Sequence, residues 1–247
     1  MKALILAAGL GTRLKDETKD KPKALVEIGG SPLIQLAIEK LKYEGIDKIV
    51  VNVHHYANQI ISFLNSHNFD IPVIISDESQ KLLDTGGALK KASHLLDGKD
   101  PVLVYNVDII SSINLRNVIE THKKSDALAT LVIRERDTDR CFKFDEKNRL
   151  VGWINRKTGE KKISDPVDFE NAAEMAFSGI HVLNPAIFKL MPEDEVFSII
   201  DLYIDLAKSY EIKGFIDNSA YWKDTGTPED LEDVRQTLSK TGWPYSH

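Results

Sequence analysis

The residues best suited to chemistry begin at positions 9–13, Gly-Leu-Gly-Thr-Arg, which directly follow an apolar run at residues 3–6. Glycines placed after a buried strand let a ligand approach the backbone closely. Arg13 adds a permanent cation at the edge of this loop. The pattern favours a cradle for nucleotide phosphates, although an ordinary strand-to-helix turn has the same composition.

Three later segments carry the charges that such a cradle needs. Lys23 lies in the run Lys-Pro-Lys-Ala-Leu, which fits either a phosphate ligand or a solvated turn. Asp108 ends an apolar run, and Asp224 lies shortly before an expected helix start. A carboxylate at the carboxyl end of a buried strand is well placed to bind Mg²⁺, but aspartate is also a common turn residue. Taken singly, none of these segments decides a function.

Two familiar nucleotide-binding patterns are missing. No Gly-Lys-Ser/Thr follows the loop, as a P-loop requires, and the third glycine of the dinucleotide fingerprint is absent. The second expected strand ends in His54 and His55, where a dinucleotide fold would place an acid for the ribose. The sequence therefore disfavours NAD as a ligand.

Composition narrows the class of protein further. The 247 residues are 42% hydrophobic and 28% charged, which is ordinary for a soluble globular chain. A net charge of −6 without any basic run argues against nucleic-acid binding. No apolar run is long enough to span a membrane or to form a signal peptide, and Cys141 is the single cysteine. We expect a cytoplasmic protein without membrane or nucleic-acid partners, as a monomer or small homo-oligomer.

The elements that must position these residues alternate in the first half of the chain. Buried strands separated by helices predict a Rossmann-like α/β fold, whose mixed, mainly parallel sheet carries helices on both faces. In such a sheet, ligands bind at the carboxyl ends of the strands. The expected strands are residues 3–6, 48–53, 72–76 and 102–108, and the expected helices are residues 33–42, 57–64 and 87–96.

The second half is less regular and richer in expected strands. Thr227, Pro228 and Asp230 form a helix start with an N-cap, an N1 proline and a capping acid. The polar residues 155–174 predict a flexible excursion. Strands are expected at residues 127–133, 141–145, 149–154, 175–183 and 212–216, and helices at residues 185–191 and 197–209.

The candidate segments together resemble a known family. In order they are L-A-A-G-x-G-T-R, K-P-K-x-L, D-T-G-G, N-x-D, S-G-I and W-x-D-T-G-T-P, and they span residues 3 to about 235. This series resembles the sugar-1-phosphate nucleotidyltransferases, with most similarity to N-acetylmuramate 1-phosphate uridylyltransferases and short bacterial mannose-1-phosphate guanylyltransferase-like proteins. The resemblance implies one GT-A-like domain over residues 1–247. Its nucleotide-binding half would cover about residues 1–110, and its β-rich sugar-phosphate half about residues 111–247.

The resemblance also implies roles for individual residues. The catalytic group would be Arg13, Lys23, Asp108 and Asp224, with Mg²⁺ held by the two aspartates. Further nucleotide contacts would fall on Ala7, Ala8, Gly9, Gly11, Thr12, Thr85, Gly86 and Gly87. The sugar phosphate would be held by Asn106, Glu174, Ser178 and Gly179. Asn106 stands where many members have glycine, which leaves the identity of the sugar undetermined.

The implied reaction joins a nucleoside triphosphate to a sugar 1-phosphate and releases pyrophosphate. Its nucleophile is a phosphate monoester with a second pKa of about 6, so it is largely ionised at neutral pH and needs no general base. Catalysis then requires in-line alignment and charge neutralisation. The first expectation is uridylyl transfer to N-acetylmuramate or a hexose 1-phosphate, in nucleotide-sugar biosynthesis for the cell envelope.

Three alternatives are open at this point. One is guanylyl transfer to mannose 1-phosphate. Another is cytidylyl transfer to phosphocholine, because Trp153, Tyr221 and Trp222 offer the aromatic rings that a choline cage requires. The third is a non-catalytic module that binds a nucleotide sugar and regulates another protein, because a fold does not determine a function.

Overall fold

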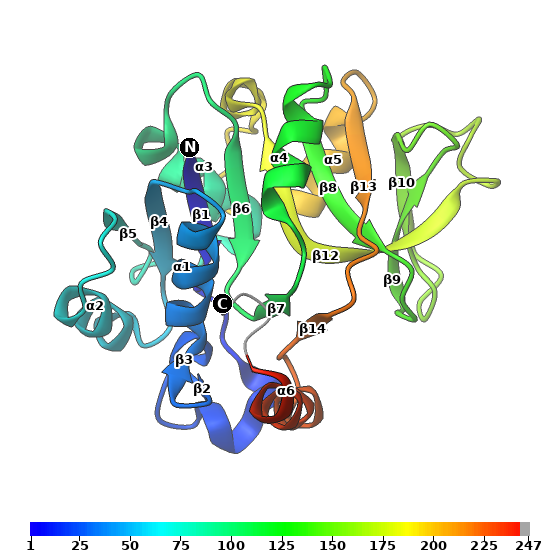
Figure 1. Ribbon diagram of the computed structural model, residues 1–247. Helices are drawn as coiled ribbons and strands as arrows, with labels where there is room; N and C mark the ends of the chain where they lie inside the picture. The colour runs from blue at the N-terminus through cyan, green and yellow to red at the C-terminus, as the bar shows by residue number, and fades with distance from the viewer. Residues whose placement is uncertain (243–247) are drawn as a thin grey trace.

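A ten-stranded sheet runs through the centre of the computed structural model, which describes residues 1–242 (Figure 1). Its main path has the order β11-β10-β9-β12-β6-β1-β4-β5, and β8 and β13 join it through β12. The parallel part consists of β1 (Lys2–Leu6), β4 (Lys48–Val53), β5 (Val73–Asp77) and β6 (Val102–Asn106). This arrangement confirms the expected mixed Rossmann-like sheet.

Helices cover both faces of this parallel part because neighbouring residues of its strands point in opposite directions. On β1, Ile5 packs into the core that includes the apolar side of α1 (Leu33–Tyr43), together with α2 (Ala57–Ser66). Leu4 packs on the other face, in the core that contains α3 (Asp84–Leu96) and α5 (Ile199–Leu206). Both β1 side chains are completely buried.

The rest of the sheet is mainly antiparallel and is organised by the long strand β12 (Ala173–Leu183). β12 pairs antiparallel with β6, and also with β8 (Ala129–Arg134) and β9 (Arg140–Phe144). β10 (Leu150–Asn155) pairs with β9, and β13 (Ile212–Ile216) pairs with β8. One sheet therefore joins the two halves of the sequence.

Residues 155–174 differ from the flexible excursion that their polarity predicts. They contain β11 (Lys161–Ile163), which pairs antiparallel with β10. Phe169 in this segment is only 1% exposed. The ammonium groups of Lys143 and Lys161 lie 4.6 and 5.4 Å from the centre of its ring. The pairing of β11 and the burial of Phe169 together attach the segment to the sheet, although the segment has no apolar periodicity.

Several elements start or stop at places the sequence does not indicate. The predicted strand 102–108 ends at Asn106, and the chain turns before β7 (Ile109–Ser111). α3 begins at Asp84, before the expected start at residue 87, so that Gly86 and Gly87 lie inside its first turns. α4 (Leu115–Lys123) was not expected. The remaining elements are η1 (Thr12–Thr18), η2 (Lys23–Leu25), β2 (Glu27–Ile28), β3 (Ser31–Pro32), η3 (Pro185–Leu190), β14 (Trp222–Asp224) and α6 (Pro228–Thr241).

The start of α6 follows the capping prediction. The Thr227 hydroxyl accepts a hydrogen bond from the backbone N–H of Asp230 at 3.1 Å, and Pro228 occupies the first helical position. In Figure 1, α6 packs beside the first part of the chain rather than beside the distal strands.

Among residues 1–242, no helix combines the length and apolar character needed to cross a membrane.

A buried ion pair ties α1 to the segment after β7. Lys40 pairs with Glu44, and both side chains are at most 5% exposed. The Lys40 ammonium also donates to the backbone carbonyl of Ile113 at 2.8 Å. This contact fixes the chain just beyond β7, the strand that follows Asp108.

We predict that Lys40→Met lowers the free energy of unfolding by about 3 kcal/mol, because it leaves the Glu44 carboxylate buried without its cation. Lys42→Met is the matched control. Lys42 pairs with Asp70 on the surface of the same helix, so its loss is expected to cost under about 1 kcal/mol. Urea unfolding of both variants checks this, and equal losses would contradict the structural role of the buried pair.

Candidate active site

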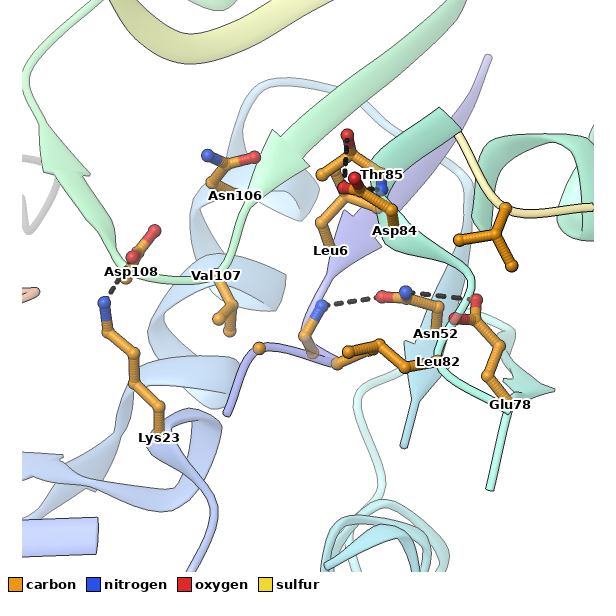
Figure 2. Close-up of a pocket in the computed structure, with 14 residues that line it drawn as sticks. Leu6, Lys23, Asn52, Glu78, Leu82, Asp84, Thr85, Asn106, Val107 and Asp108 are labelled. Carbon is orange, nitrogen blue, oxygen red and sulfur yellow. Dashed lines mark hydrogen bonds and ion pairs between the residues drawn. The ribbon is translucent and has the colours of Figure 1, made fainter. Parts of the chain in front are cut away.

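A cavity of about 510 Å³ opens at the carboxyl ends of β1 and β6 (Figure 2). This is the edge at which open α/β sheets bind ligands. The cavity is large enough for a small-molecule ligand. Its walls are formed by Leu6, Ala7, Ala8, Gly9, Lys23, Asn52, Glu78, Leu82, Asp84, Thr85, Asn106, Val107, Asp108 and Val196.

One end of the cavity contains a buried hydrogen-bond network that the sequence does not predict. The backbone N–H of Ala7 donates to Asn52 at 2.7 Å, and the Asn52 side-chain amide donates to Glu78 at 3.1 Å (Figure 2). Glu78 is 1% exposed, and its Oε2 atom has no hydrogen-bond partner. Burial raises the pKa of the Glu78 carboxyl, and the Asn52 hydrogen bond partly opposes that rise. The one local hint is a polar asparagine inside the β-branched run of β4.

The glycine loop is shaped by Gly11, whose φ of 65° is the left-handed conformation that glycine adopts most easily. A Cβ atom there would lie 3.0 Å from Thr18 Cγ2 and 3.2 Å from Lys23 Cβ. The hydroxyl of Thr18 donates to the Gly11 carbonyl at 3.0 Å. Gly11 therefore lets η1 pack against the segment that carries Lys23, while Thr12 begins η1.

The other end of the cavity leads to a cluster of charges. Lys23, which is 8% exposed, forms an ion pair with Asp108 (Figure 2). Its Nζ lies 3.7 Å from an Asp224 oxygen, and an Arg13 nitrogen lies 3.9 Å from the other Asp224 oxygen. All four predicted catalytic residues thus lie together.

Two short strands bring the aspartates together from distant parts of the chain. β14 pairs antiparallel with β7, so that Asp224 lies opposite Ile109, the residue after Asp108. Thr225 is completely buried, and both its backbone N–H and its hydroxyl donate to the Asp108 carbonyl, at 2.9 and 3.0 Å. Thr225 is a positioning residue that the sequence analysis did not identify.

The electrostatics of Asp224 suit a cation ligand. Burial raises the pKa of the Asp224 carboxyl, the negative charge of Asp108 raises it further, and Lys23 and Arg13 oppose the rise. Asp224 Oδ1 is buried and has no hydrogen-bond partner. Residues 1–242 hold no group of three or more metal-binding side chains. Two carboxylates nevertheless fit Mg²⁺, which commonly takes one or two protein carboxylates and completes its shell with phosphate oxygens and water.

Three of the four predicted sugar-phosphate residues also lie together. Gly179 has a φ of 73°, and a Cβ there would lie 2.9 Å from the side-chain nitrogen of Asn106. The indole N–H of Trp222 donates to the Ser178 carbonyl at 3.0 Å. The Ser178 hydroxyl is buried without a partner. Glu174 is instead ion-paired with Arg156 at 2.7 Å.

Two of the predicted nucleotide residues have a packing role in the structure. Thr85 lines the cavity, but Gly86 and Gly87 do not. Both glycine N–H groups donate to the carbonyl of Phe197, at 2.9 and 3.3 Å. Glycine is needed there because the 195–197 segment packs against their α-carbons, and this packing brings Val196 to the cavity.

The aromatic rings considered for a choline cage already carry cations. Arg134 and Arg136 lie 5.6 and 4.7 Å from the centre of the Trp222 ring. Lys162 lies 5.4 Å from the ring of Trp153, on the distant strand β10. The geometry therefore does not favour phosphocholine as the acceptor.

Comparison with known proteins agrees with this geometry. Residues 2–241 match the family model described as nucleotidyl transferase. The chain is 33% identical to the N-acetylmuramate alpha-1-phosphate uridylyltransferase of Caulobacter vibrioides, over 92% of each chain. It is 32% identical to the mannose-1-phosphate guanyltransferase of Yarrowia lipolytica, over 94% of this chain but 62% of that protein. HddC from Yersinia pseudotuberculosis, solved as a complex with GMP-PN, has a TM-score of 0.76 and 25% identity, over 96% of this chain and 99% of its own.

Proposed function

The chain belongs to the nucleotidyl transferase family, and we propose that it joins a nucleoside triphosphate to a sugar 1-phosphate, giving a nucleotide sugar and pyrophosphate. The observation that carries this proposal is the meeting of Lys23, Asp108 and Asp224 at one end of a nucleotide-sized cavity. The Caulobacter relative, similar over nearly its whole length, is named for a reaction of this kind.

The site residues match what the reaction demands. The sugar phosphate is already an anion, so the difficulty is to bring it against the α-phosphate of the nucleotide. Lys23 would neutralise the phosphates at the reacting centre, and Arg13 would bind the departing pyrophosphate. Asp108 and Asp224 would hold Mg²⁺, which screens the two anions from each other. We further propose a cytoplasmic enzyme that supplies nucleotide sugars for the cell envelope.

The choice of base depends on the end of the cavity that contains Glu78. The Caulobacter relative supports uracil as the first candidate. A specific observation favours guanine as the second, because the buried Glu78 Oε2 has no partner and an ionised carboxylate only accepts hydrogen bonds. Guanine offers two adjacent N–H donors to such a group, whereas uracil offers one. The structure of HddC with GMP-PN also supports this second candidate.

The first test is a matrix of the four common nucleoside triphosphates against several sugar 1-phosphates, scored by released pyrophosphate. We predict that Asp108→Asn or Asp224→Asn lowers turnover on the best pair by at least about 100-fold, because each removes charge at the reacting phosphates. The fold should survive, as judged by unchanged circular dichroism. Turnover near that of the wild type in either variant would remove that residue from the proposed metal site.

The base assignment is tested with Glu78→Gln. If guanine is the base, kcat/KM for GTP should fall by roughly 10- to 100-fold, since a charged hydrogen bond is worth about 1.5–3 kcal/mol. If uracil is the base, the glutamine oxygen still accepts from its single N–H, and the loss for UTP should be several-fold at most. Glu146→Gln, a change of an exposed glutamate far from the cavity, is the control. If Glu78→Gln had the same kcat/KM as the wild type for both GTP and UTP, this result would contradict a contact between Glu78 and the base.

A further inference from the structure

Arg136 is a cation next to the site that the reaction described above does not use. It lies between β8 and β9, and its guanidinium carbon is 4.7 Å from the centre of the Trp222 ring. Arg134 lies 5.6 Å from the same ring and is paired with Asp217 at 3.2 Å. Arg136, in contrast, forms no ion pair with any carboxylate in residues 1–242. Its charge is therefore available to a ligand.

Trp222 fixes the position of this cation relative to the reacting centre. Side chains two residues apart on a strand point the same way, so Trp222 and Asp224 share one face of β14. They are separated by about 7 Å along the strand. The indole N–H is bonded to Ser178, which places Trp222 beside the predicted sugar-phosphate residues. Arg136 thus lies on the ring of a side chain that is two residues from Asp224 and is hydrogen-bonded to Ser178.

The charges around Arg136 determine how strongly its guanidinium attracts an anion. Burial of the guanidinium lowers the pKa of Arg136, and the negative charge of Asp224 opposes that change. The positive charge of Arg134 adds to the lowering. The Arg136 side chain as a whole is exposed, so that a ligand can reach it. A cation beside a second cation gains more from an incoming anion than from a neutral hydroxyl group.

The 1-phosphate group does not explain this cation. That group must meet the α-phosphate near Lys23 and Asp224, and Arg136 is too far from Asp224 to pair with it. An arginine fork matches a carboxylate with two parallel hydrogen bonds. An acceptor that carries a carboxylate in addition to its phosphate therefore gains from a second cation near the site.

We propose that Arg136, supported by Trp222, binds a carboxylate on the acceptor sugar and selects acidic sugar 1-phosphates over neutral ones. This inference rests on the proposed function and names its acceptor class. Arg136 is then a specificity residue on the acceptor side, separate from the group that neutralises the reacting phosphates.

The test uses two matched pairs of acceptors that differ in one carboxylate. They are glucuronic acid 1-phosphate against glucose 1-phosphate, and N-acetylmuramic acid 1-phosphate against N-acetylglucosamine 1-phosphate. Binding is measured by calorimetry and turnover by pyrophosphate release, both with Mg²⁺. In at least one pair the wild type should bind the acidic member about 10-fold or more tightly, as expected for a charged hydrogen-bonded pair. Arg136→Gln should abolish this preference through KM and leave the neutral acceptors within twofold.

Arg136→Lys should retain part of the preference, because it keeps the charge but loses the fork. Arg116→Gln, which removes a guanidinium bonded to the backbone of Tyr43, is the control and should change nothing. Equal losses for acidic and neutral acceptors in Arg136→Gln, or a wild type without any acidic preference, would overturn the inference. Selective binding without turnover would support the role of Arg136 in acceptor selection and contradict the proposed reaction. Turnover without selectivity would support the proposed reaction and contradict the role of Arg136.

Discussion

The structure depends on holding two partly buried carboxylates close together. Asp108 and Asp224 repel each other, and Lys23 compensates by pairing with Asp108 and approaching Asp224 to 3.7 Å. Thr225 fixes the backbone geometry of the pair through two hydrogen bonds to Asp108. Gly11 lets η1 pack tightly enough to deliver Lys23. The glycine loop, the β7–β14 pair and the start of α6 can all be understood as supports for this charge cluster.

Much of this arrangement follows from local sequence rules. The apolar strand before the glycine loop, the alternating elements of the first half and the Thr227 cap have recognisable patterns. The meeting of Asp108 with Asp224 does not, because β7 and β14 are three residues each and too short for any periodicity. That pairing was anticipated from the family resemblance alone. The Asn52–Glu78 hydrogen-bond network, the packing role of Gly86 and the burial of Phe169 arise from long-range contacts, which a local pattern does not encode.

Charge is distributed along the cavity in a way that fits the proposed reaction. The chain carries a net charge of −6, so the cations that face phosphates are few and individually placed. Lys23 and Arg13 lie at the proposed reacting centre, and Arg136 lies over the ring of Trp222, two residues before Asp224. At the opposite end, Glu78 has a buried carboxylate oxygen without a hydrogen-bond partner, which we propose accepts from the base. The two ends of the cavity therefore carry opposite charges, an asymmetry that would orient the proposed substrate pair.

We propose that a divalent cation binds to the Asp108 and Asp224 carboxylates, whose oxygens Lys23 contacts in the structure, so that Lys23 competes with the cation. This central claim is tested most directly by Mn²⁺ affinity without substrates, measured by electron paramagnetic resonance on the wild type and on Lys23→Met. Removing the competing ammonium should tighten Mn²⁺ binding by roughly tenfold or more, since tenfold requires only about 1.4 kcal/mol. The same change combined with Asp224→Asn should abolish the gain. Equal or weaker Mn²⁺ binding by Lys23→Met would contradict the account.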